Sequence, residues 1–234
     1  MKAVFSCLDT GLRAQEIDKL GEILLERNIP AIYCSEFDAP FFKKCHPSGY
    51  YGILIGHPFG GLSEQMIIRM ISRTSELGCS AAVITLNTTA LISGQIEEFK
   101  RTVFGFAQET SRLGLDLICD GHASLLTLGQ LKILIQTVME AGAAGISLST
   151  ESALDTPELE HFLFSDRIIQ DWPEKDLRNS CHLHIPYSLL PSGVDSQADD
   201  FLGGLRSRIV LRFTDIELAA GFSPKMGRKG AENE

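Results

Sequence analysis

The chain has 234 residues and a formal net charge of −9 at pH 7, with 44% hydrophobic and 22% charged residues. These values are typical of a globular protein that buries a full-sized core. The acidic balance argues against nucleic acid and against an anionic membrane surface as partners, because both require clustered Lys and Arg side chains.

The sequence also favours a reducing, cytoplasmic compartment. The stretch 1–18 becomes polar too early to be a secretory signal. No apolar run approaches the roughly 20 residues that a membrane span needs. The six cysteines include no CxxC pair, which argues against zinc-ribbon and thioredoxin-like sites. We therefore expect reduced thiols and no resident cofactor.

Short apolar runs alternate with helical patterns along the chain. The apolar runs cover residues 2–8, 31–35, 51–56, 80–86, 115–121, 144–150, 181–187 and 208–213. They are nearly continuous, as expected of parallel strands covered on both faces. Helical patterns follow at 62–78, at 126–142 with Gly142 as a stop signal, and at 155–164 with Pro157 in the first turn.

This alternation predicts an α/β fold, a single-domain (β/α)8 TIM barrel over residues 1–222, with a flexible polar tail at 223–234. A doubly wound open sheet is the structural alternative. In a barrel of this kind, the functional site lies at the C-terminal ends of the strands.

Polar side chains stand at several of these predicted strand ends. Residues i and i+2 of a strand share a face, so pairs are expected to meet at the barrel mouth, and His57 can join them. The pairs are Thr85 with Asn87, Asp120 with His122, Ser147 with Ser149, and His182 with His184. The candidate pocket comprises Asn87, Asp120, His122, Ser147, Ser149, His182 and His184.

Three interpretations of this pocket remain open. Imidazole ligands from His122, His182 and His184, with Asp120, suit zinc or another divalent ion. Ser147 with His122 and Asp120 is a weaker nucleophilic arrangement, because an acid and an imidazole side by side on one strand orient each other poorly. In the third and favoured interpretation, these groups only hydrogen-bond one another and water inside a polar mouth, and no metal is bound.

Three stretches resemble the deoxyribose-phosphate aldolase family. GHPFGG at 56–61 is similar to that family's turn after strand 3, and ALISG at 90–94 to its segment after strand 4. LTLGQLKILIQTVMEAGAAGISLST at 126–150 matches, without a gap, the helix and strand that end in Lys-Thr-Ser-Thr. The resemblance covers roughly residues 1–150 and implies a TIM barrel that cleaves an aldol through a Schiff base on a strand-6 lysine.

The reactive positions of the family carry other residues in this chain. The Schiff-base lysine corresponds to Ser147, the strand-4 aspartate to Val83, and the strand-7 lysine to the neighbourhood of Leu190. A hydroxyl cannot form an iminium ion, so the resemblance implies a barrel of the family's fold that lacks the Schiff-base lysine. Lys132 is an unaligned alternative, but it falls within the predicted helix before strand 6 and not at a strand end.

The positions that bind phosphate in the family are altered as well. Glu151 follows Thr150 where the family has a glycine, and the strand-7 Gly-Gly turn reads Gly193-Val194-Asp195. Carboxylates repel a phosphate dianion, most strongly where solvent is partly excluded. A phosphosugar ligand is therefore not expected.

These observations predict a pseudoenzyme, an aldolase-like barrel that acts as a ligand-binding or protein-interaction module. It could form a homodimer. The alternative is an active lyase or hydrolase with different chemistry in the same mouth, with or without the help of a metal ion. The sequence names no ligand, no protein partner and no catalytic residue.

Overall fold

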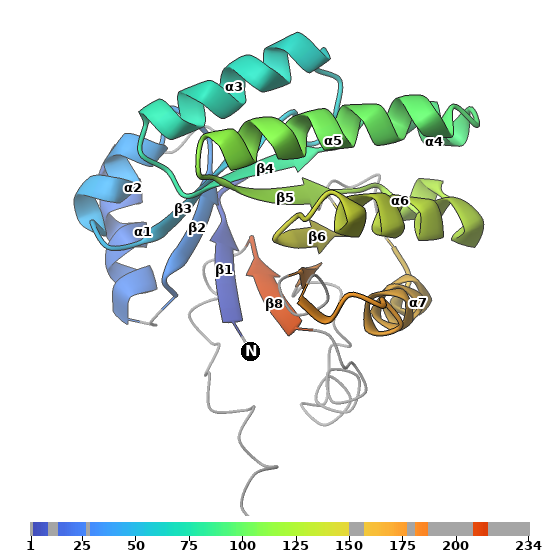
Figure 1. The fold of residues 1–234 in the computed structure, drawn as a ribbon. Helices are drawn as coiled ribbons and strands as arrows, with labels where there is room; N and C mark the ends of the chain where they lie inside the picture. The colour runs from blue at the N-terminus through green and yellow to red at the C-terminus, as the bar shows by residue number, and fades with distance from the viewer. Residues whose placement is uncertain are drawn as a thin grey trace, which may run out of the picture.

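Parallel strands and helices alternate along the chain, and the strands form the centre of the molecule (Figure 1). The computed structural model describes residues 2–8, 14–26, 29–149, 157–176, 181–186 and 208–214. Its strands are β1 (Lys2–Ser6), β2 (Ala31–Cys34), β3 (Tyr50–Ile55), β4 (Ala81–Thr85), β5 (Asp116–Asp120), β6 (Gly145–Ser147), β7 (His182–Pro186) and β8 (Arg208–Phe213). Its helices are α1 (Ala14–Glu26), α2 (Ala39–Cys45), α3 (Glu64–Glu76), α4 (Thr89–Ile92), α5 (Ile96–Arg112), α6 (Leu128–Glu140) and α7 (Leu159–Gln170), with a 3-10 turn η1 (Ala123–Leu125).

The eight strands close into a barrel. Each strand pairs in parallel with the next, and β1 pairs with both β2 and β8: Val4 lies opposite Ala31 on one side and Arg212 on the other. This closure confirms the predicted (β/α)8 barrel and excludes the open sheet. The predicted tail at 223–234 lies outside the described residues.

Two apolar layers follow from the alternation of side chains along the strands. Outward-facing residues pack against the helices; Ile32 and Cys34 of β2, for example, belong to this large outer cluster. Inward-facing residues fill the barrel itself, so that it is a packed core and not a pore. This inner cluster comprises Val4, Tyr33, Ala81, Val83, Ile118 and Val210.

Helix α6 and the turn after it set the position of β6. The helix begins with a capping box, in which Thr127 and Gln130 satisfy each other's backbone N–H groups. It ends at Glu140, and Gly142 then adopts a φ of 73°, which favours glycine. The predicted stop at Gly142 is confirmed, and the chain turns there into β6.

The predicted start of the helix at 155–164 was wrong. Helix α7 begins at Leu159 with Glu158 as its N-cap and runs to Gln170. Pro157 therefore precedes the helix and does not lie in its first turn. The backbone N–H of Glu158 donates to Nδ1 of His161 at 3.1 Å. The imidazole therefore bonds a backbone N–H that has no partner within the helix. Residues 155 and 156 lie outside the described part of the chain.

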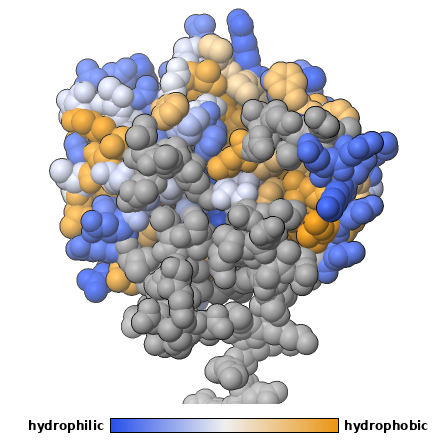
Figure 2. Space-filling model, turned by 180° about the vertical axis from the view of Figure 1, so that it is seen from behind, coloured by the Kyte–Doolittle hydropathy of each residue, from blue (hydrophilic) through white to orange (hydrophobic). Residues whose placement is uncertain are grey.

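Within the described ranges, no helix combines the length and the apolar character needed to cross a membrane. Some large hydrophobic side chains nevertheless reach the surface, among them Phe37 and Phe59 in the loops that follow β2 and β3. On the face shown in Figure 2, hydrophobic and hydrophilic side chains are interspersed.

Candidate functional site

Three of the predicted pocket residues lie side by side on adjacent strands. Asp120 ends β5 and is the register partner of Ser147 on β6, which in turn is the register partner of His184 on β7. All three side chains are buried, with exposed fractions of 0%, 0% and 2%. They face the barrel interior, because β5 and β7 alternate and Ile118 of β5 belongs to the inner cluster.

Ser147 makes a local hydrogen bond at the end of β6. Its hydroxyl donates to the backbone oxygen of Ser149 at 2.8 Å. Ser149 is itself buried, and its backbone N–H donates to the hydroxyl oxygen of Ser147 at 3.5 Å. The Ser147 hydroxyl therefore stabilises the backbone of its own loop.

Arg212 on β8 is the principal site residue that sequence reasoning missed. Its guanidinium Nη1 donates to Asp120 Oδ1 at 2.8 Å, and its Nε donates to the Ser6 hydroxyl at 2.6 Å. All three side chains are fully buried. In the closed ring of eight strands, β5 lies opposite β1 and three strands from β8. The Arg212–Asp120 bridge therefore crosses the barrel interior.

Aromatic side chains pack beside the Arg212–Asp120 bridge. The Arg212 Cζ atom lies 5.8 Å from the centre of the Tyr33 ring, within the range of a cation–π contact. The Tyr33 ring is also stacked with the imidazole of His184, with 6.0 Å between the ring centres. A cation, a phenol ring and an imidazole thus form one continuous layer inside the barrel.

Two glycines create the space that these rings occupy. A Cβ atom on Gly52 would lie 2.6 Å from Cδ1 of Tyr33, and one on Gly145 would lie 2.6 Å from Nε2 of His184. Both distances are shorter than packed atoms tolerate. The absence of side chains on β3 and β6 at these points lets the rings lie against the strands.

Burial keeps the imidazoles of His184 and His57 neutral. It lowers the pKa of His184 to about 3, with the positive charge of Arg212 acting in the same direction. It lowers the pKa of His57 to about 4, and Arg212 and His122 again contribute. Burial also raises the pKa of the Tyr33 phenol well above its usual range. A histidine with a pKa near 3 is a weak base, so His184 is poorly suited to abstract protons at neutral pH.

Some buried polar atoms of the mouth have no hydrogen-bond partner among the described residues. They include Oγ1 of Thr85 and Nδ1 of His184. Thr85 follows Ala81 and Val83 on the inward face of β4, so both orphaned atoms belong to the barrel interior. Both are neutral groups, and a hydroxylated molecule would match their hydrogen-bonding capacity.

Other predicted pocket residues are placed differently. Asn87 is exposed outside the barrel, where its Oδ1 accepts from the backbone N–H of Thr89. Strand β4 ends at Thr85, so the alternation that was to bring Asn87 to the mouth does not extend that far. Leu190 lies outside the described residues, as do Thr150, Glu151 and the turn at 193–195.

The histidines proposed as metal ligands have separate roles. His122 precedes η1 and is buried, whereas Nδ1 of His182 lies 3.1 Å from the backbone oxygen of Ala144. His184 stacks on Tyr33. Across the described ranges, no three His, Cys, Asp or Glu side chains are grouped so that they could hold a metal ion. The geometry therefore does not bring His122, His182 and His184 together as ligands.

Comparisons with known proteins bear on the fold. No protein-family model and no curated protein matches the chain. Among solved structures, the aldolase QR15 is 16% identical with a TM-score of 0.73, over 90% of this chain and 88% of that one. Deoxyribose phosphate aldolase from Aeropyrum pernix, described as a tetramer, is 14% identical with a TM-score of 0.69, over 89% and 84% of the two chains.

The structure of an enzyme with a different activity is also similar. Oxaloacetate acetylhydrolase is 14% identical with a TM-score of 0.62, and the match covers 94% of this chain and 77% of the other. At such low identities the likeness concerns the fold alone, because one barrel fold hosts many chemistries. The chain therefore has an aldolase-like TIM-barrel fold.

Proposed function

We propose that this chain is an aldolase-like barrel without Schiff-base chemistry, which acts as a ligand-binding or protein-interaction module. The main support for this proposal is the burial and hydrogen bonding of Ser147. Its hydroxyl is fully buried and donates to the backbone of Ser149. A Schiff base requires a primary amine that can attack a carbonyl carbon, and a serine at this place cannot supply one.

The distribution of lysines supports the same proposal. Every lysine whose side chain is described belongs to a helix or follows α7, outside the barrel interior: Lys19, Lys43, Lys44, Lys100, Lys132 and Lys175. Lys43 donates to the backbone oxygens of Leu77 and Gly78, and Lys132 is exposed on α6. None of these amines faces the polar layer of the mouth.

The Arg212–Asp120 bridge further disfavours a family-type mechanism. Asp120 is committed to a buried guanidinium, and Val83 packs in the apolar inner cluster. A substrate that displaced either partner would leave a buried charge uncompensated, at a cost of about 3–5 kcal/mol. The bridge is therefore better suited to maintain the barrel than to release a group for proton transfer.

The ligand that best fits this mouth is small, uncharged and hydroxylated. The positive charge of Arg212 is balanced by Asp120, which leaves little net attraction for a phosphate. The orphaned hydroxyl of Thr85 and the neutral imidazole of His184 can each form a hydrogen bond with such a ligand.

Turnover is the first test of the proposal. Purified protein should not cleave deoxyribose 5-phosphate, and an active aldolase assayed in parallel serves as the positive control. Release of acetaldehyde above the buffer rate, in proportion to the amount of this protein, would refute the proposal.

Binding experiments distinguish a ligand-binding module from a protein-interaction module. For a ligand-binding module, we expect a thermal shift with a sugar or polyol and no larger shift with the corresponding phosphosugar. For a protein-interaction module, we expect no shift with small molecules and a stoichiometric partner in a pull-down. A larger shift with the phosphosugar than with the free sugar would contradict the charge argument.

A further inference from the structure

A pocket lies outside the barrel, between helices α3 and α5 and next to the end of β4. Its volume is about 230 Å³. A buried apolar cavity of about 150 Å³ is large enough to hold benzene, so this pocket can take a small organic molecule. Its lining residues are Leu62, Ser63, Glu64, Ile67, Leu86, Asn87, Ala90, Glu98, Phe99, Thr102, Val103 and Phe106.

The floor of the pocket is apolar and rigid. Leu86, Phe99, Val103 and Phe106 are all buried, with exposed fractions of 3% or less. They belong to the main outer cluster, so the floor is part of the packed layer between strands and helices. A ligand therefore meets a preformed hydrophobic surface that includes two aromatic side chains.

The rim of the pocket is acidic. Glu64 in the first turn of α3 and Glu98 in the first turn of α5 both line it. Glu64 reaches across toward α5, since its Oε1 lies 3.7 Å from the point where a Cβ on Gly105 would be. No Lys, Arg or His is among the lining residues.

We propose that this pocket binds a small organic cation, namely a primary ammonium group on an aromatic or aliphatic body. The apolar body packs on Phe99 and Phe106, and the ammonium group lies at the acidic rim to which Glu64 and Glu98 contribute. An ammonium group donates three hydrogen bonds and carries the complementary charge. An anion is excluded by the same two carboxylates, and a neutral analogue loses the charge-assisted contacts.

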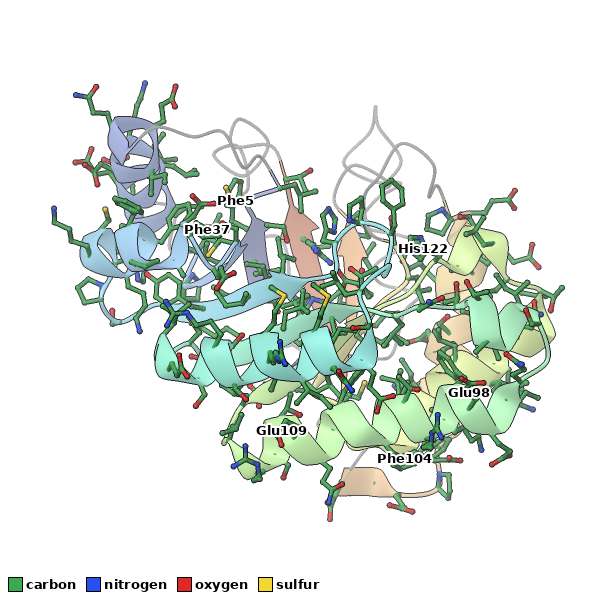
Figure 3. The ribbon with its side chains drawn as sticks, turned by 90° about the horizontal axis from the view of Figure 1, so that it is seen from above. Phe5, Phe37, Glu98, Phe104, Glu109 and His122 are labelled. Atoms are coloured by element: carbon green, nitrogen blue, oxygen red, sulfur yellow. The ribbon has the colours of Figure 1, made fainter. Side chains whose placement is uncertain are left out.

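This site is distinct from the barrel mouth. Glu98 lies in the outer helix layer, away from the strand ends where His122 is found (Figure 3). Leu86 and Asn87 line the pocket, whereas Thr85, the preceding residue, is inward-facing on β4. Ligand binding here thus needs neither the Arg212–Asp120 bridge nor any residue of the mouth.

Isothermal titration with three matched probes tests the proposal. Benzylammonium, benzyl alcohol and benzoate share a ring and differ in the charge of the substituent. We expect saturable binding of benzylammonium at one site, binding of benzyl alcohol at least threefold weaker, and no binding of benzoate. Equal affinity for benzylammonium and benzyl alcohol would overturn the proposal, and so would the lack of saturable benzylammonium binding.

Variants locate the site. Glu64→Gln and Glu98→Gln should each weaken benzylammonium binding at least threefold. Glu97→Gln is the matched control, because Glu97 is exposed on the same helix but does not line the pocket. Ala90→Leu should abolish binding by filling the cavity. Equal weakening by all the Glu→Gln changes would show a general charge effect and would overturn the proposed site.

A spectroscopic measurement tests the location without a substitution. The ring of bound benzylammonium should shift the methyl resonances of Ile67, Leu86 and Val103, which line the pocket. The methyl groups of Val83 and Val210 in the barrel interior are the internal control and should not shift. Shifts confined to the interior methyls would place the cation in the barrel mouth and contradict the proposal.

Discussion

At the scale of single residues, the Arg212–Asp120 bridge is the dominant electrostatic feature of the barrel. Both side chains have no exposed surface, and Arg212 also bonds to Ser6 and lies near the ring of Tyr33. A buried guanidinium is tolerated only where its charge is compensated and its N–H groups are bonded. The contacts with Asp120, Ser6 and Tyr33 explain how the apolar strand β8 can carry an arginine on its inward face.

Loss of one partner of this bridge should be strongly destabilising. Arg212→Met keeps the length of the side chain but leaves the Asp120 carboxylate buried without its counter-charge. We expect the free energy of unfolding to fall by about 3–5 kcal/mol in urea denaturation at neutral pH. The double variant Arg212→Met, Asp120→Leu should recover part of that loss.

The surface pair Arg112–Glu109 provides the matched control. Solvent screens an exposed ion pair, so Arg112→Met should change stability far less than Arg212→Met. If the two Arg→Met variants lost similar stability, the bridge across the barrel would have no special structural role.

The buried imidazole of His184 should make stability depend on pH. Its pKa is about 3 in the folded chain, against about 6.5 in an unfolded one. Between these values the unfolded chain binds a proton that the folded chain does not, so stability falls as the pH falls below about 6.5. We expect a loss of about 1 kcal/mol per pH unit from this group.

Urea denaturation between about pH 5 and pH 6.5, above the usual range of carboxylates, measures this slope. The variant His184→Gln should show a clearly flatter slope, whatever its stability at neutral pH. An unchanged slope in the variant would mean that His184 is already protonated in the folded chain near pH 6.

At the scale of elements, strands β3 and β6 accommodate the aromatic layer because each has a glycine facing a ring. Gly145→Ala would introduce a Cβ atom 2.6 Å from His184 Nε2. We expect a loss of about 1–3 kcal/mol on unfolding, as is typical of overpacking. The measurement is again urea denaturation.

Gly129→Ala in helix α6 is the matched control for this change. A Cβ atom there would have only one neighbour, the Thr127 hydroxyl at 4.0 Å. Alanine is the better helix former, so this variant should gain about 0.5–1 kcal/mol. Equal effects of the two Gly→Ala changes would contradict the close fit between Gly145 and His184.

The elements themselves were largely predictable from the sequence. Continuous apolar runs located most strands within a residue or two, and the run at 208–213 coincides with β8; the run at 144–150 extends three residues past the end of β6 at Ser147. Local rules failed at the ends of elements: Asn87 was treated as part of a strand that stops at Thr85, and Pro157 as part of a helix that starts later. Alternation holds only while the backbone is extended.

The Arg212–Asp120 bridge could not be predicted by local rules, because its partners are 92 positions apart in the sequence and meet only through closure of the barrel. A signal was nevertheless present. Arg212 lies in the apolar run RIVLRF, two residues after Val210, and a charged residue in a buried strand requires a partner. The convergence of Asp120, Ser147 and His184 was easier to predict from the sequence, because the ends of parallel strands lie at one edge of the sheet.

At the scale of the whole molecule, exposed hydrophobic side chains at the C-terminal end of the barrel suggest self-association. Phe37 and Phe59 are 78% and 65% exposed, and burial of such side chains commonly stabilises contacts between subunits. We propose a homodimer, so light scattering after size exclusion should give about twice the chain mass of 25.7 kDa. A mass of one chain at micromolar concentration would contradict this.

Borohydride trapping tests whether this aldolase-like barrel lacks a reactive amine. The protein is incubated with deoxyribose 5-phosphate and sodium borohydride, and its intact mass is measured beside that of an active aldolase. We predict an unchanged mass for this chain, because in our proposal Ser147 stands in place of the lysine that would form an iminium ion. A stable mass increase, mapped by peptide sequencing to any lysine, would contradict the account.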